Sequence, residues 1–472
     1  MREQRLLLAG SWIDGEDALL VRSPWDGRVV ARVARGGPAT LERAAESATR
    51  SAGAIAALPP ERRAAILEAT RADLLARKEE IAAAIVEEAG KPLTLACSEV
   101  DRAADTLLAS AHVARYPELV ARDLGGFASG AGRIALTRRV PLGPVLAITP
   151  FNFPLNLVAH KLGPAVAAGC PVVLKPASQT PSAALHLAAS LQRAGLPDGA
   201  LSVVPSRAAD AERLATDPRF ALLTFTGSHE IGFGLRQKAW GRRVALELGG
   251  NAAVIVEPDW DDLADAARRI AGGAFAWAGQ SCISVQRVLV HRDVAPALRD
   301  LLVAAAEAFP VGDPAAPETL CGPMIDEANR DRVLTWFASA RSAGGKLLSG
   351  GEADGSVVKP TLLEGVPEGE PLVSDELFGP GAALSTYATF EEALERANAS
   401  RYGLQAGVFT CDVAKVRRAW ERLEVGAVIQ GDVPTWRSDP MPYGGVKGSG
   451  VGREGPASAF LEMTEERMLV LR

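Results

Sequence analysis

The sequence predicts an α/β fold built on a parallel sheet. From Gly143 onward, short apolar segments such as 144–148 and 171–174 alternate with helical segments such as 156–168 and 181–193. Strands and helices that alternate in this way form right-handed crossovers between parallel strands. The chain has 472 residues, too many for one simple core, so we expect two or three domains.

The composition excludes several classes of protein. Hydrophobic residues make up 48% of the chain and charged residues 23%, as in an ordinary soluble enzyme. The formal net charge of −6 offers no basic surface for nucleic acid. Five cysteines, an odd number, do not indicate a disulfide framework and fit a reducing cytoplasm. No segment approaches the roughly 20 apolar residues of a membrane helix, and the N-terminus lacks the features of a signal peptide.

The first part of the chain predicts a scaffold. Residues 1–35 favour short strands broken by turns. Residues 38–115 have helical apolar spacing, and Gly90-Lys91-Pro92 is typical of a helix end. Residues 119–140 contain short extended pieces that form a hairpin. Because a lone hairpin is only marginally stable, we expect a further strand, which 465–472 can supply.

Residues at the carboxyl ends of the predicted strands are candidates for ligand binding. Asn152, Lys175 and Thr226-Gly227-Ser228 each follow such a strand. The Asn152 amide can donate to an oxygen that gains charge, an interaction of ~3 kcal/mol. The Lys175 ammonium suits a ribose hydroxyl or a phosphate, and the helix after Ser228 can present its amides to a pyrophosphate. Taken alone, Asn152 is equally typical of a turn, Lys175 is more often a surface lysine, and the Thr226–Ser228 segment also fits a plain helix cap.

The segment from Ala278 to Ser284 places Cys282 among small residues, which leaves room for a carbonyl carbon and a flat ring. A thiolate is a strong nucleophile, but a free thiol has a pKa of about 8.5 and needs a proton acceptor. Glu247, at the end of another predicted strand, is the candidate acceptor, directly or through water. Taken alone, the segment is equally compatible with a buried structural cysteine.

Several short motifs follow one another along nearly the whole chain: Thr149–Pro154, Lys175–Ala177, Phe225–Ser228, Glu247–Asn251, Gly279–Cys282, Glu376–Pro380 and Pro442–Lys447. One such motif is weak evidence, but the ordered set is specific. In this order and spacing the motifs resemble those of the aldehyde dehydrogenase superfamily. The resemblance implies a Rossmann-type cofactor domain, an α/β catalytic domain and a small β oligomerisation flap.

The same resemblance implies where the domains divide. Residues 1–118 and 141–248 are expected to form the dinucleotide-binding domain, and 249–449 the catalytic domain. Residues 119–140 and 450–472 are expected to form the oligomerisation and bridging segments. The protein is therefore expected to form a homodimer or homotetramer.

The resemblance also implies a mechanism. Cys282 attacks the aldehyde, Asn152 and the backbone N–H of Cys282 hold the oxyanion, and Glu247 activates the water that hydrolyses the thioester. Glu247 separates this chemistry from the alternative of a CoA-acylating relative, in which the glutamate role is usually lost. A non-catalytic binding protein that retains the fold is a second alternative, which replacement of Cys282 or Glu247 would have favoured.

The implied cofactor is NAD or NADP, and two departures from the family pattern bear on the choice. No Gly-x-Gly-x-x-Gly fingerprint is evident, and 203–208 lacks the glycines that relatives often carry. Ser178 stands where many NAD-preferring relatives have a glutamate that repels a 2′-phosphate, so NADP is plausible. The residues implied to bind the cofactor are Thr149, Pro150, Phe151, Lys175, Ser178, Thr226, Gly227, Ser228, Leu248, Glu376 and Phe378.

The substrate residues are inferred from position in the family. Segments 156–161 and 430–437 resemble the lactaldehyde and phosphonoacetaldehyde dehydrogenase branch. The Arg437 guanidinium suits a phosphonate, phosphate or carboxylate, although an exposed loop charge is the alternative. Lactaldehyde, a phosphonate aldehyde, a semialdehyde and a plain aliphatic aldehyde all remain open, and no metal site is predicted. The candidate substrate residues are His160, Ser281, Ile283, Trp436 and Arg437.

Overall fold

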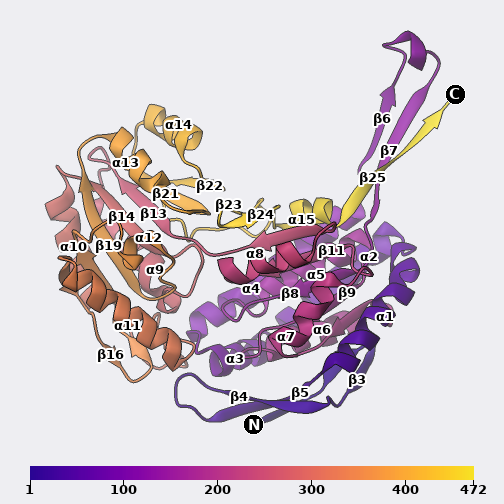
Figure 1. Ribbon diagram of the computed structural model, residues 1–472, viewed down its shortest axis with the longest axis horizontal. Helices are drawn as coiled ribbons and strands as arrows, with labels where there is room; N and C mark the ends of the chain where they lie inside the picture. The colour runs from indigo at the N-terminus through magenta and orange to yellow at the C-terminus, as the bar shows by residue number, and fades with distance from the viewer.

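The structure, a computed structural model, describes residues 1–472 and is organised around two sheets, each covered by helices on both faces (Figure 1). The first sheet has the strand order β24-β12-β11-β8-β9-β10-β2-β3. Its five central strands are parallel, and β2, β3 and β24 are antiparallel to their neighbours. The bounds are β2 (Leu6–Leu8), β3 (Ser11–Ile13), β8 (Val145–Ile148), β9 (Val172–Lys175), β10 (Leu201–Val203), β11 (Leu222–Thr226), β12 (Arg243–Glu247) and β24 (Gly450–Val451).

Alternate residues of these strands bury on opposite faces, as expected for a parallel sheet. Val145 and Ala147 pack into a core with α2 to α6, whereas Leu146 packs with α1 and α8. The helices of this half are α1 (Pro38–Ala56), α2 (Pro60–Ala76), α3 (Lys78–Ala89), α4 (Leu93–Arg115), α5 (Asn156–Ala168), α6 (Ser182–Arg193), α7 (Ala208–Glu212), α8 (His229–Lys238) and α15 (Pro456–Glu462). The predicted alternation of strand and helix from Gly143 is confirmed.

The second sheet has the order β15-β18-β19-β14-β13-β21-β22 and is parallel except for β15. Its strands are β13 (Ala252–Val256), β14 (Val285–His291), β15 (Lys346–Ser349), β18 (Thr361–Glu364), β19 (Gly381–Tyr387), β21 (Gln405–Phe409) and β22 (Ala427–Gln430). Its helices are α9 (Leu263–Phe275), α10 (Ala295–Glu307), α11 (Glu327–Ser342), α12 (Pro371–Ser374), α13 (Phe390–Asn398) and α14 (Val413–Arg422). None of the helices is both long and apolar enough to cross a membrane.

Four small sheets lie outside the two large ones, and three of them are short antiparallel or mixed sheets within the body of the molecule. They are β1 (Arg2–Gln4) with β4 (Asp17–Arg22) and β5 (Val29–Arg35), β16 (Ala353–Asp354) with β17 (Val357–Val358), and β20 (Tyr402–Gly403) with β23 (Val446–Lys447).

A three-stranded flap projects from the body of the molecule (Figure 1). It consists of β6 (Leu119–Asp123), β7 (Ile134–Pro141) and β25 (Thr464–Leu471), all antiparallel. The C-terminal strand thus joins the hairpin as the sequence predicts. The segment from residue 450 divides, however, because β24 pairs with β12 and α15 packs on α4 and α5. The returning chain therefore covers the edge of the first sheet before only its last strand enters the flap.

The strand order of the first sheet indicates which of its edges binds ligands. The chain runs from β8 through β9 to β10 in one direction, and through β11 to β12 in the other. The strand order therefore reverses between β8 and β11, and the carboxyl ends of strands at such a reversal form a crevice that binds ligands.

Candidate active site

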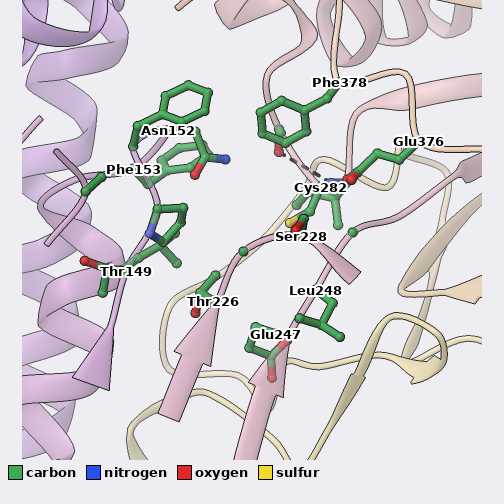
Figure 2. A pocket seen from close by; sticks show the side chains of 18 of the residues that line it. Thr149, Asn152, Phe153, Thr226, Ser228, Glu247, Leu248, Cys282, Glu376 and Phe378 are labelled. Atoms are coloured by element: carbon green, nitrogen blue, oxygen red, sulfur yellow. Dashed lines mark hydrogen bonds between the residues drawn. The ribbon is translucent and has the colours of Figure 1, made fainter. Parts of the chain in front are cut away.

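A cavity of about 1300 Å³ lies at the carboxyl ends of β8, β9, β11 and β12 and reaches the loops of the second sheet. All the predicted catalytic and cofactor residues line it, and Figure 2 shows several of them around Cys282. Of the predicted substrate residues, Ser281, Ile283 and Arg437 line the cavity. His160 is buried beyond the lining residues, and Trp436 is 49% exposed and outside them.

The turn before Cys282 is strained. Trp277 and Ala278 adopt left-handed φ angles of 57° and 51°, which bulky residues rarely accept. Gly279 continues the turn with φ 62°, and a Cβ there would lie 2.1 Å from the Gly379 carbonyl oxygen. A Cβ on Gly250 would lie 2.1 Å from the carbonyl oxygen of Cys282. Both glycines therefore allow two loops to approach the cysteine segment.

The surroundings of Cys282 favour the neutral thiol over the thiolate. Burial raises its pKa to about 12, although the hydrogen bond with Tyr443 opposes the rise. The Sγ atom lies 3.2 Å from the Tyr443 hydroxyl oxygen, and the Arg437 guanidinium stacks 3.7 Å from the centre of the Tyr443 ring. The cysteine lines the ligand cavity, so the alternative of an inert structural cysteine does not fit this placement.

Asn152 follows β8, and several bonds fix its loop. Its side-chain amide donates to the Gln280 carbonyl at 3.0 Å, which holds it beside the cysteine segment. Its backbone carbonyl accepts from Lys91 Nζ at 2.9 Å and from Trp277 Nε1 at 3.0 Å. The amide nitrogen retains a second hydrogen, so a bond to an oxyanion is compatible with this arrangement.

Glu247 ends β12, and its Oε2 has no hydrogen-bond partner. Burial, and then the charge of Glu454, raise the pKa of Glu247 well above its usual range. The pKa of Glu454 behaves differently: burial raises it, but His160, Arg437 and Lys161 together hold it below the ordinary value. Of the two carboxyls, Glu247 is therefore the one that binds a proton more readily, and in its ionised form it can act as a proton acceptor.

Arg437 belongs to a buried ionic network, so the alternative of an exposed loop charge is wrong. Its Nη2 donates to Glu454 Oε1 at 2.9 Å and lies 3.0 Å from His160 Nε2. His160 Nε2 lies 2.9 Å from Asp439 Oδ1. Arg102 of α4 donates to both Asp439 oxygens, at 2.9 and 3.0 Å, and also lines the cavity.

Sequence reasoning missed Lys91, Arg102 and Tyr443. Lys91 was placed only in a helix end, and Arg102 lies in a helix without any motif. Tyr443 belongs to the Pro442–Lys447 motif, which by itself indicates no role for the phenol. Their partners Asn152, Asp439 and Cys282 lie 61, 337 and 161 residues away, so no local pattern could have found them.

Other residues that line the cavity suit a dinucleotide. The hydroxyls of Thr149 and Thr226 are buried without partners at the strand-order reversal. Glu376 accepts from the Gly250 backbone N–H at 2.9 Å, and burial raises its pKa to about 7. Phe378 has a left-handed φ of 48° and packs edge-on against Phe151 with centroids 5.9 Å apart. These unpartnered donors and this supported aromatic ring fit a ligand with ribose and nicotinamide groups.

Comparisons with known proteins indicate the same family along nearly the whole chain. A family model described as "Aldehyde dehydrogenase family" matches residues 12–469. A 3-sulfolactaldehyde dehydrogenase of Priestia aryabhattai is 44% identical over 399 residues, which cover 84% of this chain and 83% of that protein.

Two crystal structures are similar over the whole chain. Aldehyde dehydrogenase 21 from Physcomitrella patens, in complex with the reaction product succinate, has a TM-score of 0.97 and 40% identity, covering 100% of this chain and 98% of that one. NADP-dependent glyceraldehyde-3-phosphate dehydrogenase from Bacillus halodurans C-125, complexed with NADP, has a TM-score of 0.97 and 33% identity, covering 100% of both chains.

Proposed function

The chain belongs to the aldehyde dehydrogenase family, and from this premise we propose that Cys282, Asn152 and Glu247 catalyse the NAD(P)-dependent oxidation of a small anionic or hydroxylated aldehyde to its carboxylic acid. Members of this family oxidise an aldehyde with NAD or NADP, and this chain shares that activity. The observation that supports the roles is that a nucleophile, an amide donor and a carboxyl of raised pKa line one cavity.

In the proposed reaction, the Cys282 thiol passes its proton to Glu247, directly or through water, and Sγ bonds to the aldehyde carbon. The oxygen gains negative charge, which the Asn152 amide and the Cys282 backbone N–H stabilise. When bound, an oxidised nicotinamide would accept the hydride, and Thr149, Thr226, Glu376 and Phe378 would hold that cofactor. Once a hydride has left the substrate carbon, a thioester remains. Glu247 releases the thiol proton to solvent and then takes a proton from the water that attacks the thioester, so that the carboxylic acid forms and Sγ of Cys282 leaves.

The proposed substrate carries an anionic group. Four arginines line the cavity that contains Cys282, and two of them, Arg102 and Arg437, belong to the ionic network around Asp439 and Glu454. Each faces a carboxylate within the protein, Asp439 and Glu454 respectively, which holds the arginine in place. A planar guanidinium binds carboxylates and related oxyanions well. The similar 3-sulfolactaldehyde dehydrogenase and the succinate complex of a similar structure also concern molecules with an acidic group.

The test is NAD(P)H formation with lactaldehyde, phosphonoacetaldehyde and succinic semialdehyde. Cys282→Ala should abolish turnover, and Glu247→Gln should release at most one NAD(P)H per site because the thioester persists. Arg102→Gln should raise KM for the two anionic aldehydes and leave that for lactaldehyde unchanged. Turnover that requires CoA and yields an acyl-CoA would establish the acylating alternative. A Cys282→Ala variant that stays active would refute the assigned nucleophile.

We further propose that the protein accepts NADP. Ser178 lines the cavity close in sequence to Lys175 and carries no charge to repel a 2′-phosphate. Ser178→Glu should raise KM for NADP⁺ at least about tenfold, the effect of ~1.4 kcal/mol of repulsion. KM for NAD⁺ should change little, and the uncharged variant Ser178→Ala is the control. Equal KM values for NADP⁺ in Ser178→Glu and the parent protein would contradict this proposal.

A further inference from the structure

Tyr443 is the side chain that contacts the proposed nucleophile. Its hydroxyl oxygen lies 3.2 Å from Cys282 Sγ, and its ring packs with Ile283 and Leu404. Tyr443 and Glu454 exchange two backbone hydrogen bonds of 2.9 and 2.6 Å, which fix the loop that carries the phenol. The residue is 4% exposed, so little water reaches the phenol to compete for this contact.

Ionisation of the thiol decides the direction of the hydrogen bond. While Cys282 is neutral, either its S–H or the phenol O–H can donate. A thiolate has no proton, so only the phenol can donate to it. A hydrogen bond to a charged acceptor is stronger than one between neutral groups, so the contact favours the thiolate over the thiol.

The surroundings of Tyr443 keep it a donor. Burial, and then the charge of Cys282, raise the pKa of Tyr443 well above its usual range, so the phenol retains its proton. The Arg437 guanidinium lies 3.7 Å from the centre of the ring, where a cation withdraws electron density from the phenol. Glu454, bonded to Arg437 at 2.9 Å, holds the guanidinium in that position.

We propose that Tyr443 is a further catalytic residue, whose phenolic O–H donates to Cys282 Sγ and stabilises the attacking thiolate, with Arg437 over its ring as a positioning residue. This inference rests on the proposed role of Cys282. The thiol proton goes to Glu247, directly or through water, and Tyr443 keeps its own proton throughout. The cost of forming a thiolate in a buried site is thereby reduced before the aldehyde is attacked.

The experiment measures alkylation by iodoacetamide against pH, with each cysteine followed by peptide mass spectrometry. In Tyr443→Phe, alkylation of Cys282 near pH 8 should slow about tenfold, the effect of a pKa about one unit higher. The exposed Cys411 in the same sample is the internal reference and should react as before. Tyr116→Phe, which removes the same hydroxyl from a 79% exposed site, should match the parent protein.

A second variant works in the opposite direction. Site-specific replacement of Tyr443 by 3-fluorotyrosine makes the phenol a stronger hydrogen-bond donor. Alkylation of Cys282 near pH 8 should then become faster. This variant decides the question if Tyr443→Phe loosens the fold, which would appear as new alkylation of buried Cys170 and Cys321. An unchanged Cys282 profile in the fluorinated protein overturns the role of Tyr443 alone. Full turnover after complete alkylation of Cys282 overturns the proposed nucleophile, and the role of Tyr443 with it.

Discussion

Lys91 connects the helical scaffold to the proposed oxyanion donor. Its ammonium is buried and bonds to Glu99 and to the backbone carbonyl of Asn152. Glu99 Oε1 in turn accepts from the backbone N–H groups of Leu155 and Asn156, at 2.8 and 3.1 Å. The ion pair therefore holds Asn152 itself and the end of its loop, where α5 begins.

Replacing Lys91 should damage both stability and activity. Lys91→Met leaves Glu99 buried without its counter-charge, which costs about 3–5 kcal/mol in the free energy of unfolding. Release of the Asn152 loop should lower kcat/KM by about 10²-fold, as removal of an oxyanion donor does. Urea unfolding and NAD(P)H formation measure the two effects. Lys78→Met, which breaks the exposed pair with Asp101, is the control and should cost less than about 1 kcal/mol. Equal losses of stability and activity in the two variants would contradict the role of Lys91 in holding the Asn152 loop.

The protonation states in the cavity predict a pH dependence. The pKa of Cys282 is raised to about 12, and that of Glu247 also lies above its usual range, mainly because both are buried. Both groups are neutral at low pH, and the reactive form has lost a proton. We therefore expect kcat/KM to increase from pH 7 to pH 10, measured by NAD(P)H formation with the protein shown intact at each pH. A flat or falling profile would show that the thiol ionises far more easily than its burial implies.

The residues that sequence patterns could identify are those with local signals. Cys282, Glu247 and Asn152 each follow a recognisable strand or stand in a short motif, and the structure places all three on one cavity. Arg102 and Lys91 act through partners that are distant in sequence, and a charged residue in a helix is usually solvated. Burial alone distinguishes them, and burial becomes visible only when the helices are packed.

At the scale of elements, strand and helix positions followed from apolar periodicity, but the turn before Cys282 did not. Its non-glycine residues Trp277 and Ala278 have left-handed φ angles, which no propensity favours. Such conformations persist only where the surrounding structure imposes them. Here the Trp277 indole donates to the Asn152 carbonyl, and its backbone N–H donates to the Leu320 carbonyl at 2.8 Å. Packing between distant segments thus determines the shape of the loop that presents the cysteine.

The close packing around Gly279 in this loop predicts what an added methyl group would do there. Gly279→Ala should abolish most activity and lower the unfolding temperature, because its Cβ would lie 2.1 Å from the Gly379 carbonyl oxygen and φ is 62°. Gly53→Ala is the matched control within α1, where a Cβ meets no atom within 4 Å. That variant should gain about 0.5–1 kcal/mol, since alanine favours a helix more than glycine does. Both are measured by thermal unfolding and turnover, and an active, stable Gly279→Ala protein would contradict the packing described.

At the scale of the whole molecule, the flap carries apolar side chains that nothing in one chain covers. Met468, Leu469, Val470 and Leu471 of β25 are 43–62% exposed, and Leu119 of β6 is 64% exposed. A small sheet with uncovered apolar residues and unpaired edge strands favours association. The three-stranded sheet was predictable because the hairpin needed a partner strand. The homo-oligomer remains a prediction, because contacts within one chain do not show an interface between subunits.

A charge on the flap should therefore dissociate the protein. In Leu469→Glu, a carboxylate replaces a 56% exposed leucine, and burying it in a subunit interface would cost several kcal/mol. Sedimentation velocity should show a dimer or tetramer for the parent protein and mainly monomer for the variant. Leu301→Glu makes the same change at a 37% exposed site on α10, in the other half of the molecule, and should leave the mass unchanged (Figure 1). A parent protein that is monomeric at assay concentration would contradict the predicted oligomer. A Leu469→Glu variant that is still oligomeric would show that the interface lies outside the flap.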